Sequence, residues 1–398
     1  MIGSMAEGQD PQTSVEHVPE PPDRPLRYVS LLALKLGFTA FGGPAAHIAM
    51  LRDEVVARRG WMTDRYFLDL LGASNLIPGP SSTEMVMHVG MEQAGWRGLL
   101  AAGWLFILPA ASITLAFAWA YGQFGSTPAA HWLLYGVKPV VVAIIVQAIW
   151  GLARTAMSST ITIAAGIVCL VLALLGLNEL AILLGAGVIL ALVRWLPSRI
   201  GALALLPILP LTPAFWAAVP EPFSQATLFW RFLKIGATLF GSGYVLLAFL
   251  ERDFVDQLGW ITRQQLLDAV AVGQFTPGPL FTTATFIGYL TGGVPGAAIA
   301  TVAIFLPAFL LVGLTHRYVT RIREFPLSAG FLDGVNAAAV ALMAAVALAL
   351  GRDALVDLPT IALAAAAAFL LIQYRVNSAL LIALGALAGL LMRVWFGG

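Results

Sequence analysis

Pro78-Gly79-Pro80 and Pro277-Gly278-Pro279 are two copies of one triplet, and each interrupts a segment that is otherwise apolar and compatible with a helix. Proline removes a backbone hydrogen-bond donor and glycine loosens the chain, so a helix must break at each triplet. Inside a membrane, a broken helix is tolerated only where the freed backbone groups are buried in protein or line a watery cavity. The two triplets are therefore the first candidates for a substrate site.

The composition indicates an integral membrane protein. Of the 398 residues, 59% are hydrophobic and only 11% are charged, and the mean hydropathy is +0.86. Such a chain cannot cover itself with a polar surface, so we expect the lipid bilayer as its surroundings. The net charge of +1 gives no indication of a nucleic-acid partner.

The sequence contains no pattern that is typical of an enzyme. The single cysteine, Cys169, excludes an internal disulfide and a cysteine-cluster metal site. The five histidines do not cluster with carboxylates at metal-ligand spacing, and no nucleotide-binding loop is present. We therefore expect no catalytic residue, metal or cofactor, and a membrane-embedded redox enzyme is the less favoured alternative.

The chain contains an internal duplication at an offset of 199 residues. When residues 35–80 are aligned without gaps with residues 234–279, 16 of 46 positions are identical, and these include Lys35/Lys234, Phe41/Phe240, Trp61/Trp260 and both triplets. Low complexity would instead match mainly Leu, Ala and Val. Duplicated halves with interrupted hydrophobic segments at corresponding positions are typical of secondary transporters.

We predict an all-α, polytopic membrane protein. Each of its two homologous repeats should contain about five transmembrane helices plus a re-entrant or broken helix at its triplet, since pieces of about 12 residues span only roughly 18 Å. Arg and Lys are divided more unevenly between the two sides if residues 200–219 do not cross, which favours inverted repeats. The predicted regions are a disordered polar tail (1–26), a first membrane repeat (27–199), a Pro-rich apolar linker (200–227) and a second membrane repeat (228–398).

Local signals place further elements within each repeat. Apolar runs predict a continuous first helix over residues 26–50 and 228–250. A Gly-Trp pair then closes an amphipathic link at the level of the headgroups. Thr63 and Thr262 follow, and each is expected to cap the N-terminus of the helix that leads to a triplet.

The helix that resumes after each triplet can offer neutral hydrogen-bond donors to an anion. Proline is harmless in a first helical turn, and the next N–H groups have the positive end of the helix dipole behind them. Four hydroxyl side chains follow the triplets, Ser81, Ser82, Thr282 and Thr283. A cation site would instead collect carboxylates. The alternative is that each triplet is a purely structural kink.

Lys35 and Lys234 are candidates for the cations that match a dianion. An ammonium within a spanning helix costs at least about 2.5 kcal/mol, so it is rarely present without a use. The alternative is that each lysine extends to its nearby interface. The matched Asp69 and Asp268 are expected to pair with a basic residue or to cap a turn.

Glu84 and His88 stand four residues apart, one turn after the first triplet, so they share a helix face. They could relay a proton, or they could simply bond to each other in the protein interior. The second repeat has only apolar and threonine residues at the equivalent positions.

Phe41-Gly42-Gly43-Pro44 with His47, the Gly-Trp pairs, both triplets and the weaker copy Phe240-Gly241-Ser242-Gly243 resemble the chromate ion transporter family in its long, two-domain form. The resemblance covers nearly the whole chain. It implies a multi-pass protein of the bacterial inner membrane, with two halves of opposite topology, that exports chromate, confers chromate resistance and recognises sulfate. The second repeat has Gly243 and Leu246 in place of Pro44 and His47, so no role of those two residues is carried over to it.

The resulting hypothesis is a secondary transporter of tetrahedral oxyanion dianions, bound between the two broken segments. Chromate and sulfate are its expected small-molecule partners, and a homodimer is one option for its assembly. Because sulfate has nearly the same shape and charge, a proton-coupled importer of sulfate or molybdate is the alternative. The predicted substrate-binding residues are Lys35, Gly42, Gly43, Pro44, His47, Pro78, Gly79, Pro80, Ser81, Ser82, Lys234, Gly241, Gly243, Pro277, Gly278, Pro279, Thr282 and Thr283.

Overall fold

The computed structural model describes residues 25–195, 222–240, 243–318 and 326–396. All regular secondary structure within these ranges is helical, which confirms the predicted all-α class. The prediction for the tail concerns mainly residues outside the described ranges, although the first helix already begins at Pro25. The prediction for the linker likewise falls mainly outside them.

The duplication is repeated in the order of the helices. Each element of the first unit has a counterpart at the same place in the second unit, down to a π-helical turn before the helix that leads to the triplet. The first unit contains α1 (Pro25–Thr39), α2 (Gly43–Arg52), η1 (Asp53–Arg58), α3 (Asp64–Ser74), α4 (Ser81–Phe124), α5 (Pro128–Ala156), α6 (Thr160–Leu174) and α7 (Glu179–Trp195). The second contains α8 (Gln225–Thr238), η3 (Gly243–Val245), α9 (Leu246–Leu250), η4 (Glu251–Gln257), α10 (Arg263–Phe275), η5 (Leu280–Thr282), α11 (Thr283–Thr315), η6 (His316–Tyr318), α13 (Pro326–Ala354), α14 (Leu358–Tyr374) and α15 (Ser378–Phe396).

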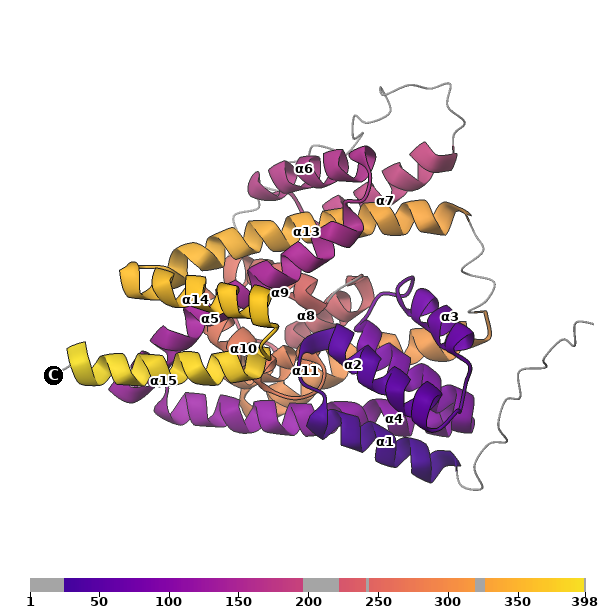
Figure 1. Ribbon diagram of the computed structural model, residues 1–398, viewed down its shortest axis with the longest axis horizontal. Helices are drawn as coiled ribbons and strands as arrows, with labels where there is room; N and C mark the ends of the chain where they lie inside the picture. The colour runs from indigo at the N-terminus through magenta and orange to yellow at the C-terminus, as the bar shows by residue number, and fades with distance from the viewer. Residues whose placement is uncertain (1–24, 196–221, 241–242, 319–325, 397–398) are drawn as a thin grey trace, which may run out of the picture.

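The two units are interleaved and run in opposite directions. Helix α7 packs against α13, and its counterpart α15 packs against α5; in the same way α6 packs against α13 and α14 against α5. In Figure 1, α7 ends at the grey trace on the upper right, whereas α15 ends at the C-terminus on the left. Opposite directions of equivalent helices are what inverted repeats require.

The first helix of each unit is broken, so the prediction of continuous helices over 26–50 and 228–250 is wrong. Helix α1 ends at Thr39 and α2 begins at Gly43. Gly42 between them has a φ of 103°, in a region that residues with a Cβ avoid. In the second unit, α8 ends at Thr238 before a helical turn resumes at Gly243. Each unit therefore has two helix breaks, one of them at its triplet.

The helices around the triplets follow the sequence signals. Thr63 accepts a hydrogen bond from the backbone of Tyr66, and Thr262 forms a reciprocal capping box with Gln265. These caps open helices of 11 and 13 residues, and both helices end before a triplet. The arm after each triplet then kinks, at 94–95 in α4 and at 292–293 in α11. The broken helix expected at each triplet, with a short arm on either side of it, is thus present.

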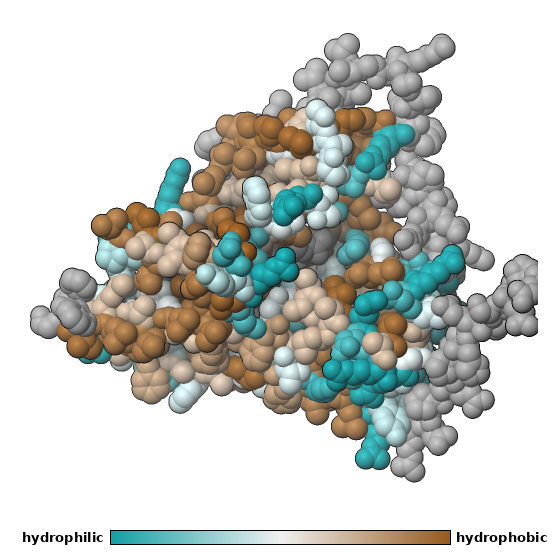
Figure 2. Space-filling model, viewed as in Figure 1, coloured by the Kyte–Doolittle hydropathy of each residue, from teal (hydrophilic) through white to brown (hydrophobic). Residues whose placement is uncertain are grey.

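Four of the described helices are long and apolar enough to cross a bilayer, namely Ser81–Phe124, Pro128–Ala156, Leu280–Tyr318 and Ala329–Ala354. Three shorter apolar helices lie in α6, α14 and α15. Large apolar side chains such as Trp150 and Leu358 are exposed on the outside. Figure 2 shows apolar side chains over most of this face and hydrophilic ones gathered over α1 to α3. The chain is a multi-pass membrane protein.

Candidate substrate-binding site

The breaks of one unit are bonded to the breaks of the other. The backbone N–H of Gly79 donates to the carbonyl of Leu239 at 2.7 Å, and that of Gly278 donates to the carbonyl of Ala40 at 2.8 Å. Ala40 and Leu239 are equivalent residues, and each directly precedes the break in the first helix of its unit. Each triplet therefore donates a backbone hydrogen bond to the first helix break of the other unit.

Only glycine fits the middle position of the triplets. Gly79 has a φ of 149° and Gly278 a φ of 91°. A Cβ on Gly278 would lie 2.8 Å from the Cβ of Ala110, and one on Gly79 would lie 2.2 Å from Oε1 of Glu84 and 3.4 Å from the Cβ of Ala308. Because glycine has no side chain, the backbone of each triplet can approach the opposite unit closely.

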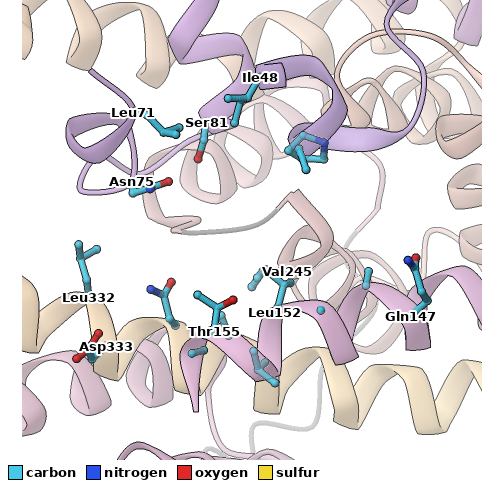
Figure 3. A pocket seen from close by; sticks show the side chains of 18 of the residues that line it. Ile48, Leu71, Asn75, Ser81, Gln147, Leu152, Thr155, Val245, Leu332 and Asp333 are labelled. Carbon is cyan, nitrogen blue, oxygen red and sulfur yellow. The ribbon is translucent and has the colours of Figure 1, made fainter. Parts of the chain in front are cut away.

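A cavity of about 800 Å³ adjoins the breaks of the first unit. In Figure 3, Ile48, Leu71, Asn75 and Ser81 lie on one side of it, and Leu152 and Thr155 of α5 lie on the opposite side. Apolar residues such as Ile48 and Leu71 form much of the wall. The polar side chains that line the cavity are uncharged apart from Asp333, and they are Asn75, Ser81, Gln147, Thr155 and Asn336.

The electrostatic character of the cavity comes from dipoles rather than from free charges. Among the described residues that line it, none is Lys or Arg, and Asp333 forms an ion pair with Arg194. Helices α2 and α4 begin at the cavity, where Gly42 and Ser81 contribute to its wall. The N-terminus of a helix carries unpaired N–H groups and favours an anion by about 0.3 to 1 kcal/mol. The cavity can therefore hold an anion with neutral donors.

Three of the predicted substrate-binding residues line this cavity, namely Gly42, Pro44 and Ser81. His47 lies behind them, 4% exposed, with Nδ1 3.3 Å from the Ser82 hydroxyl. The sequence did not indicate Asn75, Gln147 and Asn336, because single amides in apolar helices carry no recognisable spacing.

Each of the two candidate lysines has a carboxylate partner. Nζ of Lys35 lies 2.5 Å from Glu54, and Nζ of Lys234 lies 2.5 Å from Asp253. The hydrogen bond from Lys35 lowers the pKa of Glu54, which stands in the link η1. Glu54 and Asp253 are equivalent at the offset of 199, but a search for identical residues misses a glutamate that matches an aspartate. A direct role of the lysines in binding stays a prediction.

The hydroxyl groups after the second triplet bond to their own turn. Thr282 donates to the carbonyl of Pro279 at 2.9 Å, and Thr283 donates to that of Leu280 at 2.8 Å. Gly243 is buried, and Gly241 lies outside the described residues. The structure therefore brings Ser81, which directly follows the first triplet, to the open cavity, whereas Pro78, Gly79, Pro80 and these two hydroxyl groups are not among the residues that line it.

In the second unit, the counterparts of the cavity residues are packed together. Gln274 is 7% exposed, whereas its counterpart Asn75 is exposed. Leu280 corresponds to Ser81 and replaces its hydroxyl with an apolar side chain. Lys138, the counterpart of Asn336, lies 3.4 Å from Asp268, and the Tyr121 hydroxyl donates to Asp268 at 2.8 Å. The prediction that Asp268 pairs with a basic residue is confirmed. The space beside the second triplet is therefore closed, although Ala345, Val346 and Ala349, the counterparts of Gln147, Ala148 and Gly151, line a separate pocket of about 450 Å³.

Glu84 lies at the first triplet and is fully buried. Within the described part of the chain, neither of its carboxylate oxygens has a hydrogen-bond partner. His88, one turn further, bonds instead to His316 of the second unit, with 3.0 Å between their Nδ1 atoms. His316 was not indicated by the sequence, because it lies 228 residues away. No group of acidic, histidine or cysteine side chains in the described residues could hold a metal ion.

The inverted units, the apolar helices and a cavity between broken helices define a polytopic membrane protein of the transporter class. The family model described as Chromate transporter matches residues 28–191 and 226–390, once in each unit. The chain therefore belongs to the chromate transporter family, as the resemblance of its motifs indicated.

Curated relatives match nearly the full length of the chain. It is 32% identical over 396 residues to the Chromate transport protein of Cupriavidus metallidurans, covering 97% of this chain and 98% of the relative. It is 32% identical over 409 residues to the Chromate transport protein of Pseudomonas aeruginosa, covering 97% of each. The Probable chromate transport protein of Synechococcus elongatus is also 32% identical, over 376 residues that cover 92% of this chain and 95% of the relative. No solved structure matches the chain significantly.

Proposed function

We propose that this protein exports chromate across the bacterial inner membrane and thereby confers chromate resistance. The observation that carries the proposal is the cavity of about 800 Å³, which combines two helix N-termini with uncharged hydrogen-bond donors and no unpaired charge. Such a site can replace the water around a dianion with neutral donors. The names of the relatives supply the identity of the anion.

The absence of a free cation among the described cavity residues suits a transporter, because the ligand must also leave. A buried cation would hold a dianion through strong electrostatic attraction. Several neutral hydrogen bonds to a charged group contribute about 1.5 to 3 kcal/mol each, and they can be broken one at a time. We therefore expect moderate affinity, with sulfate as a competitor of the same charge and shape.

The membrane potential is sufficient to drive export. Moving one elementary charge through 100 mV is worth about 2.3 kcal/mol, so a dianion that leaves a cell with a negative interior gains about 4.6 kcal/mol. This free energy corresponds to roughly three decades of concentration gradient. Export of the dianion therefore needs no nucleotide.

The test is labelled chromate flux in proteoliposomes under an imposed potassium diffusion potential. We expect flux in the direction set by the potential, inhibition by sulfate, and no inhibition by chloride at equal concentration. Absence of potential-dependent chromate flux would refute the proposal. Sulfate import that depends on an inward proton gradient, without chromate export, would support the proton-coupled importer instead.

Gln147→Leu and Gln373→Leu form a matched pair for the site. Gln147 lines the cavity, whereas Gln373 is an exposed residue of α14. Because a hydrogen bond to a charged group contributes about 1.5 to 3 kcal/mol, Gln147→Leu should raise the KM for chromate by roughly 10-fold to 100-fold. Gln373→Leu should leave the KM unchanged. Equal KM values in both variants would place the anion elsewhere.

A further inference from the structure

A row of hydrogen-bonded ionisable side chains joins the two units beside the first triplet. His88 of α4 and His316 of η6 lie with their Nδ1 atoms 3.0 Å apart. Nε2 of His316 lies 3.2 Å from Oε2 of Glu92, and that oxygen accepts a hydrogen bond from the Tyr66 hydroxyl at 2.7 Å. The row therefore runs from His88 of the first unit to His316 of the second unit, and from there to Glu92 of the first unit.

The inner end of the row is a buried acid without a partner. Glu84 is 0% exposed, and neither of its oxygens is hydrogen-bonded within the described residues. The same is true of Nε2 of His88. The two side chains share a helix face one turn apart, with about 5 to 6 Å between their Cβ atoms, a gap that side-chain rotation or one water molecule spans. Burying an unpaired carboxylate is costly, so Glu84 can take up a proton that the row delivers.

The outer end of the row reaches the protein surface. The side chain of Glu92 is 37% exposed, and that of His316 is 12% exposed. Exposure of the side chains thus rises from Glu84 to Glu92. A neutral imidazole has one nitrogen that accepts a proton and one that donates, so the two central members can pass a proton on by exchanging tautomers.

We propose that Glu92, His316, His88 and Glu84 form a proton path that protonates Glu84 when the oxyanion binds, so that each anion is carried together with one proton. This inference rests on the proposed function. A proton passes from the Glu92 carboxyl to Nε2 of His316, and the proton on Nδ1 of His316 passes to Nδ1 of His88. The proton on Nε2 of His88 then passes to the Glu84 carboxylate, and each imidazole ends neutral in its other tautomer.

Electrostatics couples the proton to the anion. A carboxylate and an oxyanion near the same triplet repel each other, so binding of the anion raises the proton affinity of Glu84, and protonation of Glu84 raises the affinity for the anion. The other ionisable groups beside the path are Tyr66 and Asp69 on α3 and His47 on α2, which faces Ser82.

Only one of the two units has this path. The segment after the second triplet that corresponds to Glu84–Glu92 contains no Glu or His, and Leu290 stands at the position of Glu92. One proton site per cavity follows. Each transport cycle then carries one dianion together with one proton, and so moves a single net negative charge.

The test follows chromate flux and internal pH together, in proteoliposomes that contain a trapped pH-sensitive dye. For the wild-type protein we expect about one proton per chromate. For Glu84→Gln, which mimics the protonated acid, we expect chromate flux without proton movement. The potential that balances a given chromate gradient should then fall by half relative to wild type, because two net charges move instead of one.

His316→Gln tests the path without altering the buried acid. We expect proton-coupled chromate flux to slow roughly tenfold or more, as for the loss of other acid–base groups, with no change in the binding of chromate at equilibrium. His131→Gln is the matched control, since His131 is exposed on α5, and it should behave as wild type. Unchanged flux in His316→Gln would remove His316 from the path.

The outcomes separate this inference from the proposed function. Potential-driven chromate flux without any proton movement in the wild type would overturn the proton path and leave chromate export intact. Proton movement that persists in Glu84→Gln would overturn the assignment of Glu84. Absence of all chromate flux would overturn both proposals.

Discussion

The two units share one order of helices but differ in what lies beside their triplets. In the first unit, Asn75 and Ser81 face an open cavity. Beside the second triplet, Gln274, the equivalent of the exposed Asn75, is buried, and Lys138 of α5 is paired with Asp268, whereas Asn336 of α13, the counterpart of Lys138, lines the cavity. One fold is thus present in an open and a closed arrangement within a single molecule.

Inverted repeats can give access to one side of a membrane at a time when their two halves differ in this way. Because the units are equivalent in construction, the open arrangement of the first is available in principle to the second, and exchange of the two arrangements would move the opening across the membrane. The ion pair of Lys138 with Asp268 and the hydrogen bond from Tyr121 join α10 of the second unit to α5 and α4 of the first. If the second unit opened, Lys138 would face the anion.

The largest expected loss of stability comes from a substitution at the glycine whose backbone N–H bonds to the opposite unit. Gly278→Ala should destabilise the protein by about 2 to 5 kcal/mol, because a Cβ at φ 91° is strained and meets Ala110 at 2.8 Å. Gly79→Ala should cost less, since its Cβ meets mainly the movable end of Glu84. Thermal unfolding in detergent micelles measures both.

Gly95→Ala is the control for these variants. Gly95 has a φ of 59°, but nothing lies within 4 Å of its Cβ position, so only strain of about 1 to 2 kcal/mol is expected. If all three variants are equally stable, the close contact between the units does not contribute to the free energy of unfolding.

The matched ion pairs should give the next largest effect. Lys234→Met leaves Asp253, which is 3% exposed and retains only a longer contact of 3.5 Å with Arg231, and should destabilise the protein by about 2 to 3 kcal/mol. Lys35→Met should cost less, because Lys35 is half exposed and Arg59 still contacts Glu54 at 3.2 Å. Unfolding of the single variants and of Lys234→Met with Asp253→Asn gives the coupling energy.

The same double variant tests whether the lysines bind substrate. When lysine and carboxylate are removed together, the unpaired charge is gone and the fold should recover. Normal chromate affinity in that variant would assign the pair to structure. Lost affinity with recovered stability would support the prediction that the lysine faces the anion.

Features that are specified by a few neighbouring residues were predictable from the sequence. Proline, glycine and threonine specify breaks and caps within a few residues, which is why the triplets and the caps at Thr63 and Thr262 were predicted correctly. The break at Gly42 was missed because the apolar run continues through it, and the hydropathy pattern conceals a φ of 103°. The duplication was visible because the offset of 199 is constant from residue 35 to residue 80.

Features that depend on tertiary contacts were not predictable. The partner of His88 comes from the other unit, 228 residues away. Nor could the sequence indicate which unit is open, because both units carry nearly the same local signals. The difference depends on a few positions, such as Asn336 against Lys138, whose significance appears only when the cavity is known.

A smaller effect is expected from loosening the closed unit. Asp268→Asn removes the charge that holds Lys138, and a loss of about 1.4 kcal/mol would raise the open population of the second unit roughly tenfold. The labelling rate of Leu280→Cys by a water-soluble thiol reagent should rise by this factor, whereas that of Ser81→Cys should fall or stay constant. The native Cys169 is buried and gives little background. A rate at Leu280→Cys that does not respond to Asp268→Asn would mean that other contacts keep the second unit closed.

The smallest expected difference concerns the two helix caps. Thr63→Ala and Thr262→Ala should each cost about 1 kcal/mol, because each removes an acceptor for the first turn of its helix. Thr262→Ala should cost a few tenths more, since it also disrupts the capping box with Gln265. Hydrogen exchange of the two helices is the sharper measurement, because α3 borders the open cavity while α10 packs against α5 and α13. If the caps alone set local stability, both helices should lose protection equally; if the open and closed arrangements also contribute, α3 should lose far more.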